Sequence, residues 1–78
     1  MKLEKISTNV TKVFLPGWTV LFSYNTPVAA FELETCKYYR TSEFHSVTTS
    51  RHINQFVKGR EDRTEERPQE FFNQIVEG

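Results

Sequence analysis

The sequence predicts a small α+β domain: a four-stranded antiparallel meander with one helix packed on it and a short C-terminal amphipathic helix. Three observations support this. Apolar and aromatic residues alternate with a period of two between residues 10 and 44, the spacing becomes helical after Ser46, and a second helical arc follows Pro68. The expected organisation within this single domain is sheet plus helix at residues 1–59, a charged linker at residues 60–67 and the second helix at residues 68–78.

Turn signals separate the four predicted strands. The strand at residues 10–15 ends at Pro16-Gly17, and the strand at residues 18–24 ends at Asn25-Thr26-Pro27. The remaining strands are expected at residues 28–34 and 37–44, with a reversal around Cys36. Consecutive strands of a meander need no crossover, so every pair is expected to be antiparallel. The polar residues 1–7 are expected to be a frayed end or an edge.

The alternation assigns faces to the strands. Trp18, Val20, Phe22 and Tyr24 share the face of the second strand that is expected to be apolar, and Leu21 points the other way. In the third strand, Val28, Ala30, Glu32 and Glu34 are expected to oppose Ala29, Phe31 and Leu33. The two small alanines indicate that a helix approaches this strand closely.

A helix of about ten residues is predicted between the cap candidates Ser46 to Thr49 and the stop signal Gly59. Its spacing places Ile53 on the buried side and Arg51 opposite, with His52 and Asn54 on the flanks. After it, residues 60–67 contain no apolar side chain and are expected to be a solvated linker or an exposed helical lead-in.

The second helix is predicted to begin at Pro68. Phe71, Phe72, Ile75 and Val76 share one arc, which can pack back on the sheet or dock in a groove of a partner.

The balanced net charge conceals an asymmetry. Residues 1–60 contain eight Lys and Arg against four Glu, whereas residues 61–78 contain two Arg against six acidic residues. A basic body with an acidic tail is compatible with nucleic-acid binding and equally with an ordinary solvated surface. The single cysteine, Cys36, excludes an internal disulfide and favours a reducing compartment. No signal peptide or bilayer-spanning run is expected, so no membrane association is predicted.

Two motifs, FSYNTPVA from residue 22 and TTSRHIN from residue 48, follow a shared pattern, F-S-Y-x-T-x-V-A and then S/T-T-T-G/S-K/R-H-L/I-N. The chain thereby resembles a family of short phage- and plasmid-borne proteins of unknown function. It departs from them at Ser50, where relatives often carry Gly, and at Phe44-His45, where many have Asn and Trp. The resemblance implies a phage or mobile-element accessory protein, and the reducing compartment expected from the single cysteine is then the cytoplasm of the host cell.

Enzymatic chemistry is not expected, because the chain is too short to enclose a catalytic cleft around His52. No metal site or cofactor is predicted, since His45, His52, Cys36 and Glu43 lack the spacing of a structural zinc site. The start of the TTSRHIN helix is either a capped structural element or an anion site.

The predicted function is therefore a non-enzymatic interaction module that binds and modulates a host or phage macromolecule, with a protein as the expected partner. A homodimer is expected because aromatic residues occur on both sheet faces. The predicted partner-binding residues are Tyr24, Arg40, Arg51, His52, Asn54, Phe71 and Phe72. The alternative is a small nucleic-acid-binding protein that uses an aromatic and basic sheet surface. The residues predicted for that alternative are Lys37, Tyr38, Arg40 and Arg51.

Overall fold

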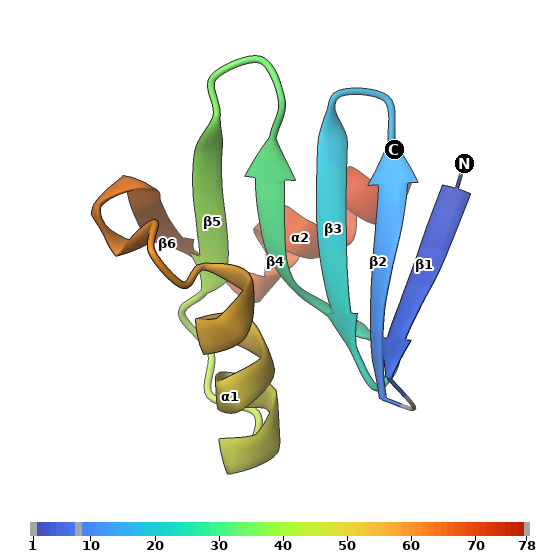
Figure 1. Cartoon of the computed structure of the whole chain (residues 1–78), viewed down its shortest axis with the longest axis vertical. Coiled ribbons are helices and arrows are strands. Elements are labelled where there is room, and N and C mark those ends of the chain that lie inside the picture. The colour runs from blue at the N-terminus through green and yellow to red at the C-terminus, as the bar shows by residue number, and fades with distance from the viewer. Residues whose placement is uncertain (1, 8, 78) are drawn as a thin grey trace.

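The structure is a computed structural model that describes the backbone of residues 2–7 and 9–77 and the side chains of residues 9–77. One mixed sheet separates two α-helices, with α1 in front of it and α2 behind it in the view of Figure 1. The strands are β1 (Lys2–Ser7), β2 (Val10–Leu15), β3 (Trp18–Ser23), β4 (Thr26–Glu32), β5 (Lys37–Thr41) and β6 (Thr64–Arg67). The helical elements are α1 (Val47–Phe56), the short 3-10 turn η1 (Glu61–Arg63) and α2 (Gln69–Glu77). The predicted α+β class is confirmed.

The sheet has six strands in the order β1-β2-β3-β4-β5-β6, so the predicted number of four is wrong. Strands β2 to β5 form the expected antiparallel meander, and β1 extends it as an antiparallel edge strand. Strand β6 pairs with β5 in parallel, after a crossover that contains α1. Both additional strands lie at sheet edges, where one side needs no hydrogen-bonded neighbour and polar side chains are favoured. Residues 64–67, predicted as part of a linker, therefore pair with the sheet without an apolar pattern.

Each face of the sheet carries its own apolar cluster. Beneath α1 the buried residues are Val10, Leu21, Val28, Ala29 and Ile53. On the α2 face they are Val20, Ala30, Tyr39 and Phe72, with Trp18, Phe22 and Phe71 packed around them. Ala29 and Ala30 are adjacent in β4 and both fully buried, so one small residue lies on each face. The close helix approach expected from the two alanines occurs on both sides of the sheet.

A register shift between β3 and β4 alters the predicted alternation. Leu21 pairs with Ala29, whereas Phe22 pairs with Pro27, and Val28 is the extra residue of the resulting bulge. Val28 consequently joins Ala29 in the α1 cluster and does not share the face of Ala30. The tight turn before β4 is formed around Tyr24, whose φ of 62° lies in the left-handed region. Tyr24 is thus a turn residue, not the last apolar-face residue of the strand.

Helix α1 begins and ends close to the predicted signals. The Ser46 hydroxyl accepts a hydrogen bond from the backbone N–H of Thr49 and caps the first turn. Gly59 follows the last turn with a φ of 82°. Ile53 is buried and Arg51 is exposed, as predicted from the helical spacing. Within the described residues, neither α-helix has the length and apolar character needed to cross a membrane.

Candidate functional site

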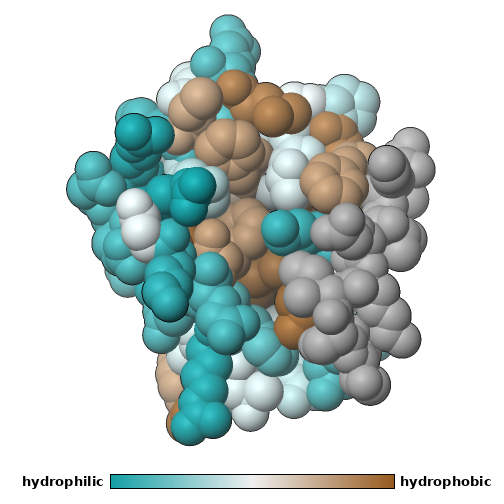
Figure 2. Space-filling model, in the orientation of Figure 1, coloured by the Kyte–Doolittle hydropathy of each residue, from teal (hydrophilic) through white to brown (hydrophobic). Residues whose placement is uncertain are grey.

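Helix α1 covers only part of its sheet face and leaves an open groove of about 690 Å³ beside it. Apolar side chains gather at the centre of this face, next to more hydrophilic material over α1 (Figure 2). Val10 and Leu21 contribute the aliphatic lining. The rest of the lining is aromatic (Phe14, Phe31, Tyr38 and Phe56) or polar (Lys12, Thr19, His52, Gln55 and Arg60). We call this site the aromatic groove.

Three of the four rings in the aromatic groove contact one another. Phe31 of β4 and Tyr38 of β5 are directly opposite in the strand register, and their ring centroids lie 4.6 Å apart. Phe56, in the last turn of α1, meets Tyr38 edge to face at 5.7 Å and 70°. None of these rings is fully buried. The contacts therefore hold partly exposed aromatic surface in one fixed arrangement.

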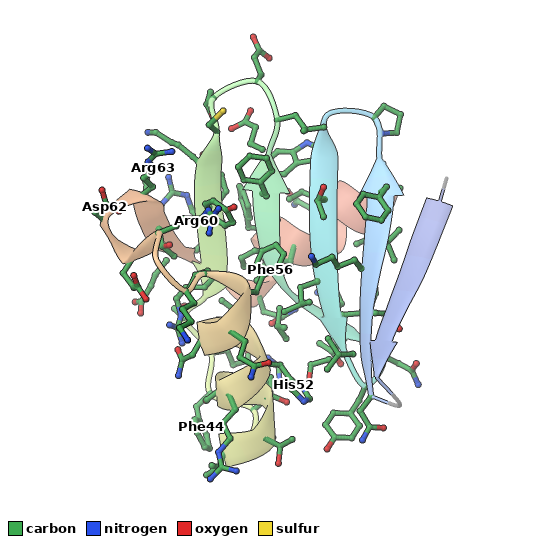
Figure 3. All side chains as sticks on the ribbon, in the orientation of Figure 1. Phe44, His52, Phe56, Arg60, Asp62 and Arg63 are labelled. Carbon is green, nitrogen blue, oxygen red and sulfur yellow. The ribbon has the colours of Figure 1, made fainter. Side chains whose placement is uncertain are left out.

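Two cationic side chains lie over this ring cluster. The Arg60 guanidinium carbon is 5.6 Å from the Tyr38 ring centroid, and the Lys12 ammonium is 5.9 Å from the Phe56 centroid. Arg60 also donates a hydrogen bond to the backbone carbonyl of Lys58 at 3.1 Å, which restricts its position. Among the described side chains, no carboxylate lines the aromatic groove. Figure 3 shows Asp62 pointing away, beyond β5.

A hydrogen-bonded network fixes α1 against the sheet next to the aromatic groove. The buried Ser23 hydroxyl lies 2.8 Å from His52 Nδ1 and 3.0 Å from Thr49 Oγ1. Asn54 Oδ1 accepts a hydrogen bond from Arg40 Nη1 at 3.1 Å. His52 and Asn54 therefore brace α1 on β3 and β5, as the structural interpretation of the TTSRHIN segment predicts, whereas the cap of the helix is Ser46, which precedes this segment.

The predicted site residues do not converge on one surface. Phe72 of α2 is fully buried between the helix and the sheet, so its assignment to a partner-binding surface is wrong. Phe71 is half-buried, with its ring 6.0 Å from Trp18 and 5.1 Å from Tyr39. The amphipathic arc of α2 thus packs on the sheet, because this burial removes its rings from water.

The remaining predicted residues are dispersed. Tyr24 is exposed at the β3–β4 turn, with its ring 6.2 Å from that of His52, and Arg51 is exposed on α1 outside the groove lining. Lys37 donates to Glu65 of β6 at 3.0 Å. Of all the predicted site residues, only His52 and Tyr38 line the aromatic groove.

Strand β6 is tied to β5 through charged side chains. Hydrogen bonds from Lys37 and Arg67 lower the pKa of the Glu65 carboxyl. The hydrogen bond between Lys37 and Glu65 also raises the pKa of Lys37. The Arg67 guanidinium also lies 5.2 Å from the Tyr39 ring centroid. Burial and the neighbouring Glu32 raise the pKa of Tyr39, whose hydroxyl donates to Glu32. Residues 64–67 of the acidic tail are therefore part of the sheet.

Of the eleven described residues that line the groove, the sequence interpretation assigned only Tyr38 and His52 to a site, and the residues that it missed include Phe14, Phe31, Phe56 and Arg60. A signal for them was present, since the alternation places Lys12 and Phe14 on the same face of the first predicted strand. Their convergence requires the β4–β5 register and the position of α1, which the alternation alone does not supply. Among the described residues, no group of three or more His, Cys, Asp or Glu side chains is arranged to hold a metal ion.

The chain has significant similarity to a known protein family. Residues 1–74 match the model of a family of unknown function (DUF8033). No curated protein and no solved structure is significantly similar to the chain.

Proposed function

The chain belongs to this family of unknown function, and from that premise we propose that it is a non-enzymatic accessory protein that binds a macromolecule through the aromatic groove. A phage or other mobile-element setting is proposed from the sequence resemblance alone. The observation that carries the binding function is the composition of the groove: four rings and two cations, with no carboxylate among its described side chains.

The groove chemistry favours binding over catalysis. His52 is the one imidazole among the described side chains that line the groove. Its Nδ1 is engaged by Ser23, and the network continues to Thr49 within the protein. Aromatic faces beside cations instead complement a flat, anionic ligand by stacking and by charge attraction.

A fluorescent aromatic sulfonate, anilinonaphthalene sulfonate, tests this assignment because it is both flat and anionic. We expect saturable binding to the folded protein, with NMR shift changes centred on Phe31, Tyr38 and Phe56. Tyr38→Leu and Arg60→Gln remove a ring and a groove charge, and both should weaken binding. Arg63→Gln makes the same charge change at an exposed position of η1 outside the groove and should leave binding unchanged.

The assignment fails if the sulfonate does not bind or if the shifts map elsewhere on the folded protein. Near-ultraviolet circular dichroism of each variant serves as the control, because loosened cores also bind this dye.

The homodimer is a separate proposal. Aromatic residues on both sheet faces favour it, but α2 covers the face that contains Trp18 and Tyr39, so those rings are not open to a second copy. Phe44 and Val47 nevertheless present exposed apolar surface around the start of α1. Sedimentation velocity over a range of protein concentrations decides the oligomeric state, and a constant monomer mass would eliminate the dimer.

A further inference from the structure

We propose that the occupant of the aromatic groove is single-stranded nucleic acid, with bases stacked on the ring cluster and phosphates facing Arg60 and Lys12. This inference rests on the groove being the binding surface of the protein. It names the chemical class of the ligand and makes Tyr38 and Arg60 its principal contacts.

The ring cluster supplies the stacking platform. Tyr38 is its centre, because both Phe31 and Phe56 contact it, at centroid distances of 4.6 and 5.7 Å. Every nucleobase has a flat π-face, so such a platform binds single strands with little sequence preference. In a duplex those faces are stacked on neighbouring base pairs and are not available to protein rings. The groove chemistry therefore selects unpaired strands.

The charge of the groove matches a phosphate backbone. Lys12 and Arg60 come from opposite sides, one from β2 and the other from the segment after α1. The chain as a whole has ten basic and ten acidic residues, so a groove with cations and no described carboxylate departs from its average surface. Arg60 already lies over Tyr38 at 5.6 Å, and a guanidinium in that position can stack on a bound base while contacting phosphate.

The floor of the groove argues against a peptide as the occupant. An extended peptide must satisfy its backbone N–H and C=O groups, usually by adding to a free sheet edge. The groove lies on the face of β2, β3, β4 and β5, which are all internal strands with neighbours on both sides. Their backbone groups are committed to the sheet ladders, so a peptide backbone lying there would face mainly rings. Base stacking needs no such partners.

Fluorescence anisotropy with a labelled oligothymidine of about 12 nucleotides tests the inference, since known single-strand modules occupy about 4–16 nucleotides. The comparison ligands are the corresponding duplex and an acidic peptide that alternates Glu and Tyr. We expect the single strand to bind most tightly. With two phosphate contacts, the logarithm of the binding constant should fall with the logarithm of salt concentration with a slope of about −1.4.

Two variants locate the contacts. Tyr38→Leu keeps an apolar side chain but removes the ring, and we expect it to weaken single-strand binding at least about fivefold. Arg60→Gln should weaken binding and reduce the salt slope by about 0.7. Arg63→Gln is the matched charge control, at an exposed position outside the groove lining, and should change only the weak background attraction. Arg60 is the position chosen for this test because its guanidinium lies over Tyr38, the centre of the ring cluster.

The outcomes separate this inference from the proposed function. If the aromatic sulfonate binds in the groove but no oligonucleotide binds at low salt, the nucleic-acid inference is overturned and the groove assignment stands. Tighter binding of the acidic peptide or of the duplex than of the single strand also overturns it. Oligonucleotide binding that survives both Tyr38→Leu and Arg60→Gln in folded protein would place the site elsewhere. If neither probe binds, both proposals are wrong.

Discussion

Phe72→Ala is expected to remove much of the stability of the domain. The Phe72 side chain is fully excluded from water in the cluster with Val20, Ala30 and Tyr39. Truncation of a buried Phe to Ala costs about 3–5 kcal/mol, since transfer free energy is lost and a cavity remains. A domain of 78 residues has a total stability of roughly 4–12 kcal/mol at typical values per residue. At the low end of this range the variant is expected to be largely unfolded at room temperature, and at the high end it stays folded with a lower urea midpoint.

Phe44→Ala provides a matched control, because the same atoms are removed from a side chain that is 72% exposed. Its effect should stay within about 0.5 kcal/mol. Urea denaturation followed by Trp18 fluorescence measures both variants, and Trp18 reports on α2 because its ring is 6.0 Å from that of Phe71. If Phe72→Ala costs less than about 1 kcal/mol, or no more than Phe44→Ala, the packing of α2 on the sheet is refuted.

Three further predictions concern individual polar groups. Ser23→Ala should destabilise the domain by about 1–3 kcal/mol in urea denaturation, because His52 Nδ1 and Thr49 Oγ1 lose a buried partner; a neutral effect would mean that this network does not hold α1. The folded-state pKa of Glu65 is lowered, so its contribution is present above the unfolded pKa and is lost as the pH falls through the folded value. The protection of β6 amides against exchange, relative to the intrinsic rate at each pH, should accordingly fall in acid more than that of β3 amides, and Glu65→Gln should abolish this acid-dependent loss. The pKa of Tyr39 is raised, so its contribution is present below the unfolded pKa and is lost as the pH rises toward the folded value. Ultraviolet titration should show one phenol ionising above pH 10, and the same curve for Tyr39→Phe would contradict this.

The antiparallel meander could be predicted from sequence because its residues obey local rules. Pro16-Gly17 marks the β2–β3 turn, and Ser46 and Gly59 mark the limits of α1 through capping and left-handed geometry. Strand β6 could not be predicted in this way. Its sequence, TEER, has no apolar alternation, and its pairing with β5 depends on a parallel crossover and on the Lys37–Glu65 contact. Long-range pairing of polar strands leaves no periodic signal.

The candidate site was less predictable than the fold. Tyr38 and His52 were identified from residue type, but the bulge at Val28 and the placement of α1 decide which rings remain open. Phe72 was misassigned because an amphipathic arc looks the same whether it packs on its own sheet or on a partner. Only the packed structure separates these two outcomes.

The position of α2 has a consequence for synthesis on the ribosome. All six described strands precede α2 in the chain, so they can pair before Phe71 and Phe72, which cover the α2 face of the sheet, have emerged from the ribosome. Until then Trp18 and Tyr39 lack the cover that Phe71 and Phe72 provide. We expect stalled nascent chains ending before residue 69 to be bound by chaperones that recognise apolar segments, and release of the complete helix to end that association.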